Sequence, residues 1–438
     1  MNQMDLPKKL IVILLWGLFS YLVSQLLVDA ENTQKGLLVL LLCAGLWMTE
    51  IVPLPVTALL VPVISYFMGM LSPKEAMAPF SSTIIFLFMG GFTLAALLNK
   101  HGIDRWLADK VTTMSNGNLW VSVVGFFAVT SFLSMWMSNT ATTAMMIPIA
   151  IALVDKTYPR MRTMIILGTA YSANIGGNGT AVGSPPNGLA VSALDIDFFT
   201  WFKVGFPTAL VMFPLVIIAL WLMIKPEKDA KVNRLSDHNS MNWSPEAKGT
   251  IALFLFTVIC WIFSSQIGAS LGLKNFDRMI AILITALAPA FKLITWKELE
   301  DKIGWGILLL FGGGLCLSVV LGETGTSLWL ATALINSIST PWIIIFACIA
   351  LMVFLTELSS NTGSAAILIP VMMALSNQFD PAVTYALVFG VGLAANCAFM
   401  LPVATPPNAL VYGTGYICLL YTSPSPRDRT RSRMPSSA

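Results

Sequence analysis

The sequence predicts an all-α polytopic membrane protein in which the two halves of the chain are inverted repeats. Of its 438 residues, 56% are hydrophobic and 11% are charged, about half the share of charge that a soluble domain carries. Long apolar stretches recur from one end to the other. In addition, the segment 138–148 (SNTATTAMMIP) returns 222 positions later as 360–370 (SNTGSAAILIP). Together these features predict membrane helices that form a duplicated unit.

Eight apolar stretches are long enough, or nearly so, to span a bilayer. They cover residues 10–28, 36–49, 51–71, 83–99, 202–224, 249–268, 277–291 and 304–322. The first stretch follows Lys8 and Lys9 and resembles the core of a signal peptide. It is too long for one, has no convincing cleavage site and precedes many further spans, so we expect it to be retained as the first helix.

Two further apolar segments, 119–154 and 341–376, are each long enough for two short helices and carry one Ser-Asn-Thr cluster near the middle. Polar groups in the middle of a bilayer are costly unless they meet backbone, water or a ligand. We therefore expect each cluster to form the tip of a re-entrant hairpin, which enters and leaves the membrane on the same side.

Segments 163–198 and 380–413 are also long, and a Pro-Pro-Asn sequence interrupts each of them. The first interruption runs from Gly176 to Asn187, and the second covers 404–408. Two consecutive prolines remove two backbone donors and cannot continue a helix. Each segment is therefore predicted to be two half-helices that flank unwound backbone.

The distribution of Lys and Arg supports this layout. If the N-terminus is cytoplasmic, the hairpins return to their own side and the broken helices cross, then the inside segments hold sixteen Lys and Arg and the outside segments hold five. This is a strong positive-inside bias. Five crossings lie between the two hairpins, so the hairpins open to opposite sides and the halves are inverted.

The layout divides the chain into six parts. They are the N-terminal scaffold helices of repeat 1 (1–118), the first hairpin and broken helix (119–200), a connecting helix and cytoplasmic linker (201–248), the scaffold helices of repeat 2 (249–340), the second hairpin and broken helix (341–417) and a C-terminal tail (418–438). The tail has no helical pattern and holds four arginines. We expect it to be a foreign sequence that replaces the native end; the alternative is a basic tail that contacts anionic lipid.

The repeated tips contain Ser, Thr and Asn but no Lys or Arg. Hydroxyl, amide and unwound backbone oxygens suit a hard monovalent cation such as Na⁺, and helix N-termini hold carboxylates. Such side chains more often join helices than bind ligands, but their duplication at matched positions favours a binding site. The pattern predicts a carrier in which bound cations neutralise an anion within the membrane.

Other chemistry is disfavoured. The chain has no nucleophile elbow, P-loop, HExxH or paired-carboxylate pattern, so an intramembrane enzyme is not expected. Six scattered cysteines without a CxxC motif and two distant histidines argue against a disulfide framework, haem or zinc. Glu357 lies deep in the second hairpin and is either a proton-coupling group or a hydrogen-bonding cap. Glu50 is expected at a membrane edge.

These motifs resemble those of the divalent anion:sodium symporter family, and most closely its bacterial INDY-type dicarboxylate carriers. The resemblance rests on both Ser-Asn-Thr tips and on segments 50–57, 175–187 and 399–408, and it extends over about residues 8 to 417. It implies a homodimer of eleven-helix protomers, each with a scaffold domain and a mobile transport domain that works as an elevator. It also implies Na⁺-driven uptake of succinate, malate or fumarate.

The resemblance also implies site residues. One Na⁺ site would use Ser134, Ser138, Asn139 and backbone near Gly183, and its mirror would use Thr356, backbone near Ser359, Asn361 and Ala404. The substrate carboxylates would meet Ser138, Asn139, Thr140, Ser360, Asn361, Thr362 and the turn at Thr405 and Pro406. Two departures stand out: Asn396 replaces the usual Ser of the second signature, and the final helix is missing after Tyr416.

The function expected from the sequence is secondary active transport of dicarboxylates across the cytoplasmic membrane, driven by at least two Na⁺ ions. A dicarboxylate, the lipid bilayer and a second copy of the chain are the expected partners, and nucleic acid is not. The alternatives are a Na⁺-independent dicarboxylate exchanger on the same fold and a sensor that binds dicarboxylate without transporting it. The sensor is disfavoured because the chain has no signalling domain and the linker 225–248 is too short to be one.

Overall fold

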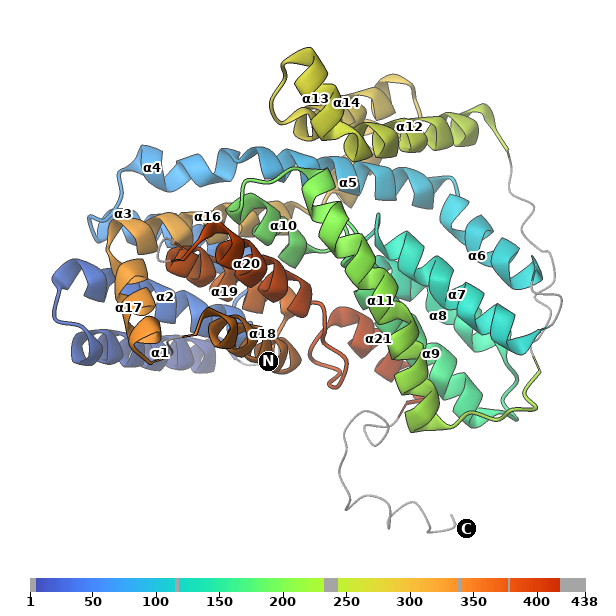
Figure 1. Cartoon of the computed structure of the whole chain (residues 1–438), viewed down its shortest axis with the longest axis horizontal. Coiled ribbons are helices and arrows are strands. Elements are labelled where there is room, and N and C mark those ends of the chain that lie inside the picture. The colour runs from blue at the N-terminus through green and yellow to red at the C-terminus, as the bar shows by residue number, and fades with distance from the viewer. Residues whose placement is uncertain (1–4, 115–117, 232–242, 338–339, 377–378, 418–438) are drawn as a thin grey trace, which may run out of the picture.

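The structure, a computed structural model, describes residues 5–114, 118–231, 243–337, 340–376 and 379–417. Within these ranges all regular elements are helical (Figure 1). They are α1 (Leu6–Leu27), α2 (Glu31–Thr49), α3 (Leu54–Phe67), α4 (Pro73–Met77), the 3₁₀ helix η1 (Ala78–Ser81), α5 (Thr83–Lys100), α6 (Ile103–Met114), α7 (Leu119–Ser134), α8 (Asn139–Leu153), α9 (Pro159–Gly177), α10 (Pro185–Ala193), α11 (Phe198–Ile224), α12 (Pro245–Ile262), α13 (Ser264–Leu271), α14 (Phe276–Ala290), α15 (Trp296–Lys302), α16 (Trp305–Glu323), α17 (Thr326–Ser337), α18 (Pro341–Leu358), α19 (Asn361–Ser376), α20 (Pro381–Ala394) and α21 (Pro406–Gly413).

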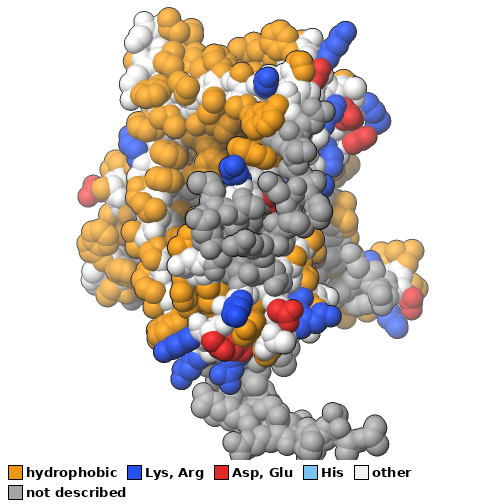
Figure 2. Space-filling model, turned by 90° about the vertical axis from the view of Figure 1, so that its right-hand side faces the viewer, with side chains coloured by type: hydrophobic (Ala, Val, Ile, Leu, Met, Phe, Trp, Pro, Cys, Tyr) orange, Lys and Arg blue, Asp and Glu red, His pale blue; other side chains and the backbone are white. Residues whose placement is uncertain are grey.

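Several of these helices are suited to a membrane. Six segments of the described chain are long and apolar enough to cross one: α1, the run from α4 to α5, α11, α12, α16 and α18. Much of their surface is hydrophobic and exposed, as on α1, where Leu6, Leu14 and Leu26 are all more than two-thirds exposed. Figure 2 shows one side of the molecule with a broad hydrophobic area, and charged side chains lie mainly toward its lower edge and its upper right. The predicted polytopic membrane protein is confirmed.

The two predicted hairpins and the two predicted broken helices are present. α7 and α8 form the first hairpin, and α18 and α19 form the second, each with a short turn at the Ser-Asn-Thr cluster. α9 and α10 are separated by unwound residues 178–184, and α20 and α21 by 395–405. The proline pairs lie at the first two positions of α10 and α21. There the missing N–H groups have no helical partner to lose, so the prolines start the second half-helices.

In a first group of helices, formed by α3, α5, α14 and α16, each helix of one repeat packs on a helix of the other repeat. α3 of repeat 1 packs on α16 of repeat 2, and α14 of repeat 2 packs on α5 of repeat 1. The contacts are close: a Cβ on Gly313 would lie 2.5 Å from the Cα of Ala58, and a Cβ on Gly90 would lie 2.8 Å from the Cα of Ala281. Gly90 and Gly313 are equivalent positions of the two repeats, and so are Ala58 and Ala281. Both glycines therefore serve close helix packing.

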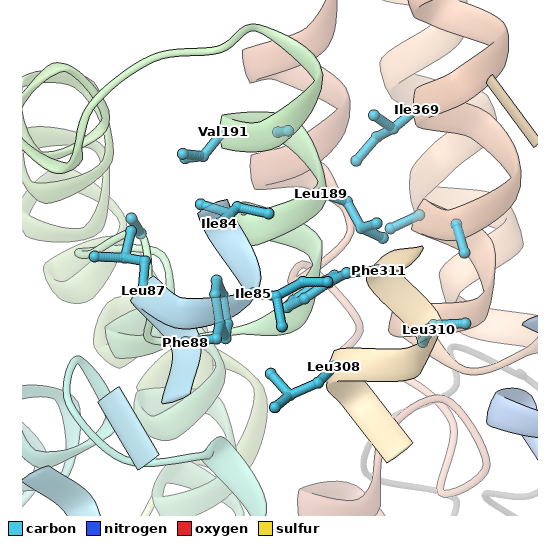
Figure 3. Close-up of a cluster of buried hydrophobic side chains, with 14 of the residues drawn as sticks. Ile84, Ile85, Leu87, Phe88, Leu189, Val191, Leu308, Leu310, Phe311 and Ile369 are labelled. Atoms are coloured by element: carbon cyan, nitrogen blue, oxygen red, sulfur yellow. The ribbon is translucent and has the colours of Figure 1, made fainter. Parts of the chain in front are cut away.

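A cluster of buried hydrophobic side chains lies where α5, α10, α16 and α19 meet (Figure 3). Phe88 of α5 and Phe311 of α16, which are equivalent in the two repeats, contact each other edge to face with ring centroids 4.6 Å apart. A contact between equivalent residues places them on either side of a pseudo-two-fold axis. The duplication seen in the sequence is therefore also a spatial symmetry of this core.

A second group, formed by the two hairpins and the two broken helices, also has contacts between the repeats. α10 of repeat 1 packs on α19 of the second hairpin, and α21 of repeat 2 packs on α8 of the first hairpin. The interface between the two groups is one-sided. α19 packs on α2, α16 and α17, whereas among the described residues α8 makes no comparable contact with α5 or α12. Each group is thus pseudo-symmetric, but their mutual packing is not.

Some elements were not predicted. The short helices α4, α6, α15 and α17 lie between the predicted spans, and the predicted stretch 249–268 is divided at Phe263 into α12 and α13. α4, α6 and α15 contain charged residues, and α17 is apolar but too short to span a bilayer. α15 is joined to α5 by an ion pair of 2.6 Å between Lys100 and Glu298, and the hydrogen bond from Lys100 lowers the pKa of Glu298 to about 2. His238, the tail 418–438 and part of the linker lie outside the described residues, so the predictions made for them are not examined by the structure.

Candidate functional site

The first hairpin tip brings together two predicted cation ligands. α7 ends at Ser134, and α8 begins at Asn139. The hydroxyl of Ser134 donates to Oδ1 of Asn139 at 2.7 Å. Ser138 caps α8, and its Oγ accepts from the N–H of Ala141 at 3.2 Å. Ser134 and Asn139 are buried, and Ser138 is half-buried. A buried, uncharged pair of oxygens therefore lies at the N-terminus of a helix, where the dipole is positive.

Two glycines let the first broken helix reach this tip. A Cβ on Gly177 would lie 2.4 Å from Oδ1 of Asn139, and a Cβ on Gly183 would lie 2.4 Å from the backbone oxygen of Gly177. A larger residue at 177 would push the first tip away from the end of α9, and one at 183 would push the unwound segment away from Gly177. Ser134 and Asn139 are hydrogen-bonded to each other, and Gly177 lies against both Asn139 and Gly183. Their oxygens are all neutral, as suits a monovalent cation.

The asparagine of each Pro-Pro-Asn sequence holds its own break in shape. Nδ2 of Asn187 donates to the backbone oxygens of Gly177 and Thr180, both at 2.7 Å. Nδ2 of Asn408 donates to those of Ala398 at 3.1 Å and Leu401 at 3.0 Å. Each asparagine thus binds the backbone oxygens ten and seven residues before it, and we call each such pair of hydrogen bonds a clamp. The two clamps are the structural reason for the repeated motif, because unwound backbone in a membrane needs internal partners.

The second tip has a related but different set of bonds. The hydroxyl of Thr356 donates to the backbone oxygen of Ala395 at 2.7 Å, and Ser359 is hydrogen-bonded to Ser364 at 2.9 Å. Oδ1 of Asn361 accepts from the N–H of Thr362 at 2.8 Å. Ala404, the fourth member of this predicted cation site, is buried, but the described hydrogen bonds do not connect it with the other three.

A chain of hydrogen bonds leads from the second tip to the end of α9, which packs against the first tip. Asn361 donates from Nδ2 to Oδ1 of Asn396 at 3.4 Å, and Asn396 donates from its own Nδ2 to Oδ1 of Asn187 at 3.0 Å. Asn187 is bonded to Gly177, which lies against Asn139. The two Ser-Asn-Thr clusters therefore converge on one buried region, although 222 positions separate them in sequence.

The predicted substrate residues are more accessible than this chain of hydrogen bonds. Thr140, Ser360 and Thr362 are half-buried, like Ser138. Thr405 is buried and caps α21, accepting from the N–H of Asn408 at 3.3 Å, whereas Pro406 is exposed. The described contacts do not connect Thr405 or Pro406 directly with either tip. Thr405 instead contacts α9 of repeat 1, where Nδ2 of Asn174 lies 3.5 Å from its Oγ1.

A cavity of about 390 Å³ opens at the second tip. Its lining consists of Met48, Thr49, Glu50, Leu358, Ser359, Ser360 and Val403. Glu50 is exposed, caps the C-terminus of α2 and has a φ of 46°. The cavity gives the hydroxyl of Ser360 access from outside the protein, between the second hairpin and the end of α2.

Glu357 is engaged by backbone. Its carboxylate accepts from the N–H of Phe399 at 2.6 Å, of Met400 at 3.0 Å and of Leu401 at 3.1 Å. It is buried and fixes the unwound segment of the second broken helix. This arrangement favours the hydrogen-bonding role over proton coupling, because both oxygens are used by amides.

Sequence reasoning missed several residues of this region. Asn174, Asn178, Ser184, Asn187 and Asn408 all take part in the polar contacts between the breaks. The signal was present in the repeated Pro-Pro-Asn sequence, which was interpreted only as a helix breaker. The sequence pattern does not show that these contacts join one repeat to the other.

The chain is similar in sequence to known transporters. The family model described as citrate transporter (CitMHS) matches residues 44–392 and 279–422. An uncharacterized transporter of Haemophilus influenzae is 38% identical over 405 residues, covering 88% of this chain and 86% of the relative. The sodium-dependent dicarboxylate transporter SdcS of Staphylococcus saprophyticus is 33% identical over 451 residues, covering 93% and 86%. SdcS of Staphylococcus aureus is 30% identical over 436 residues, covering 88% and 81%.

Proposed function

This chain belongs to the citrate transporter (CitMHS) family and to the divalent anion:sodium symporter family of its SdcS relatives, and from this premise we propose that it imports C4-dicarboxylates by Na⁺ symport. That it is a multi-pass membrane transporter of the citrate and dicarboxylate type, and not an enzyme, follows from the family. The finer proposal names succinate, malate and fumarate as substrates and at least two Na⁺ ions as the coupled cargo.

The observation that carries the proposal is the convergence of two uncharged hairpin tips on one buried region. A dianion in the membrane is costly without counter-charge, and the tips contain no Lys or Arg. Ser134, Asn139 and backbone near Gly183 offer neutral oxygens to one Na⁺, and Thr356, Asn361 and neighbouring backbone offer them to a second. The N-termini of α8 and α19 then hold the substrate carboxylates.

This arrangement explains why substrate and ion would move together. With both Na⁺ ions and the dicarboxylate bound, the site carries no net charge and can cross the low-dielectric region. With the anion alone it cannot, because the charge would remain unpaired. Coupling then follows from electrostatics alone and needs no proton-accepting side chain, in keeping with the engaged carboxylate of Glu357.

The one-sided packing of the two helix groups supports an elevator mechanism for this chain. The group that holds α7–α10 and α18–α21 would be the moving domain, and the group that holds α2, α3, α5, α14 and α16 the scaffold. Because each group is pseudo-symmetric, moving one against the other exchanges the packing of α19 for the equivalent packing of α8. We place the protein in the cytoplasmic membrane as a homodimer with a cytoplasmic N-terminus.

Uptake of labelled succinate into proteoliposomes tests the proposal. With an inward Na⁺ gradient the purified protein should accumulate succinate above its external concentration, and with choline in place of Na⁺ it should not. Equal uptake in both conditions would replace symport by Na⁺-independent exchange. Succinate binding without any uptake would favour a sensor.

A further inference from the structure

Asn396 holds a central place between the repeats. It is fully buried in the unwound segment after α20. Its Nδ2 donates to Oδ1 of Asn178 at 2.6 Å, to Oγ of Ser184 at 2.8 Å and to Oδ1 of Asn187 at 3.0 Å. All three acceptors belong to the break of repeat 1, and all three are buried. A single side chain of repeat 2 thus contacts the unwound segment of repeat 1 at Asn178 and Ser184 and the first turn of α10 at Asn187.

The same amide also contacts the second hairpin. Oδ1 of Asn396 accepts from Nδ2 of Asn361 at 3.4 Å. This bond is the longest of the four, so it can shorten or break when Asn361 turns toward a ligand. A serine hydroxyl at this position has a single O–H donor and a shorter reach, so it could not contact both segments in this way.

Asn174, which lies 222 positions before Asn396 in the first broken helix, makes a much looser connection. Its Nδ2 lies 3.2 Å from the backbone oxygen of Ala398 and 3.5 Å from both Oγ1 of Thr405 and Oδ1 of Asn408. Its Oδ1 is buried without a partner. The connection through Asn396 is therefore a particular feature of one side, and symmetry alone does not require it.

We propose that Asn396 is a positioning residue that couples the two cation sites. This inference rests on the proposed function, since it concerns the same two cation sites. Asn361 belongs to the second site, and Ser184 adjoins Gly183 of the first. A cation that draws Asn361 toward itself changes its bond with Asn396, and Asn396 holds Ser184 and the Asn187 clamp. Binding of one Na⁺ thereby prepares the other site, which makes binding cooperative.

The test measures cation binding at one fixed temperature, where occupancy of the sites saturates. The tryptophan fluorescence of the purified protein is followed against Na⁺ concentration, with choline keeping ionic strength constant. The unfolding temperature is recorded separately at each Na⁺ concentration, because a ligand that binds the folded state raises it. The wild type should respond with a Hill coefficient above about 1.5, and Asn396→Ser and Asn396→Leu should lower it to about 1. The Na⁺ concentration for half-maximal response should rise at least about threefold in both variants.

Thr169→Val is the matched control. Thr169 is equally buried, and its hydroxyl bonds only within α9, to the backbone oxygen of Ile165 at 2.8 Å. It should leave the Hill coefficient unchanged. The proposal is overturned if the variants at position 396 keep the wild-type Hill coefficient while unfolding earlier at every Na⁺ concentration. A wild-type coefficient of one would also overturn it but leave Na⁺ coupling intact, and no Na⁺ response at all would contradict the proposed function as well.

Discussion

At the scale of single residues, the molecule relies on asparagine. A side-chain amide both donates and accepts, so it can replace the missing partners of unwound backbone and still present an oxygen to a ligand. Asn187 and Asn408 use this capacity to close the two breaks, and Asn139 and Asn361 place it at the hairpin tips. The same residue type thus serves structure in the breaks and, in our proposal, binding at the tips.

The tip asparagines are the first prediction. Asn139→Ala and Asn361→Ala should each lower Na⁺-driven succinate uptake at least tenfold, because each removes a buried polar group worth about 1–3 kcal/mol. Uptake into proteoliposomes measures the effect. Asn99→Ala is a matched control. Nδ2 of Asn99 donates to Oδ2 of Asp104 at 3.1 Å, and neither residue belongs to a hairpin tip. Wild-type rates in both tip variants would remove the site assignment.

Glu357 gives the second prediction. In Glu357→Gln, the amide nitrogen faces the backbone N–H groups of 399–401, which lose a charged acceptor. We expect a loss of stability of about 1–3 kcal/mol and reduced uptake at every pH. Thermal unfolding and the pH profile of uptake measure these effects. If instead the variant keeps its stability and only loses the pH dependence of transport, Glu357 is a proton-coupling group.

At the scale of helices, close packing between repeats depends on small residues. Gly313 is in contact with the backbone of Ala58, where a Cβ would lie 2.6 Å from the backbone oxygen. Backbone in two packed helices moves only with strain. This makes the contact between α3 and α16 a rigid element against which other helices can move.

The third prediction follows from this contact. Gly313→Ala should lower the free energy of unfolding by about 1–3 kcal/mol, as overpacking does. Gly322→Ala in the same helix, where a Cβ would meet nothing within 4 Å, should be neutral or stabilise by up to about 1 kcal/mol. Thermal unfolding of the two variants in one detergent compares them. A more stable Gly313→Ala would show that α3 and α16 are not tightly packed.

The elements themselves were largely predictable, and their contacts were not. Length and hydrophobicity indicate most long helices, and polar tips and proline pairs indicate the hairpins and breaks. The pairing of Asn396 with Asn178, Ser184 and Asn187 joins positions more than 200 residues apart. Such contacts depend on how whole helices pack, which local pattern does not encode. For the same reason Glu357 was assigned to its own hairpin, whereas it binds the second break.

At the scale of the molecule, two pseudo-symmetric groups of helices meet at an asymmetric interface. A Cβ on Gly363 of α19 would lie 3.2 Å from the backbone oxygen of Trp47 and 3.5 Å from the side chain of Leu54. The second hairpin therefore rests on the turn between α2 and α3. In an elevator this contact must break in each cycle, and the equivalent contact of the first hairpin must form.

A disulfide across this contact is the fourth prediction. In the double variant Leu54→Cys, Gly363→Cys, mild oxidation should join the two groups and stop uptake, and a reductant should restore it. The reduced and oxidised forms of the same protein control for effects of the substitutions. The described native cysteines are buried or half-buried, which limits competing disulfides. Full uptake by the cross-linked protein would exclude movement at this interface.

The central claim is that two mirrored, uncharged tips form one site for a dicarboxylate and its Na⁺ ions. Equilibrium binding of labelled succinate to the purified protein tests it most directly, with Na⁺ or choline present and in the wild type, Asn139→Ala and Asn361→Ala. We predict that succinate binds the wild type only with Na⁺ and that either substitution weakens this binding at least about tenfold. Succinate binding that persists in choline, or that keeps its wild-type affinity in either variant, would contradict the claim.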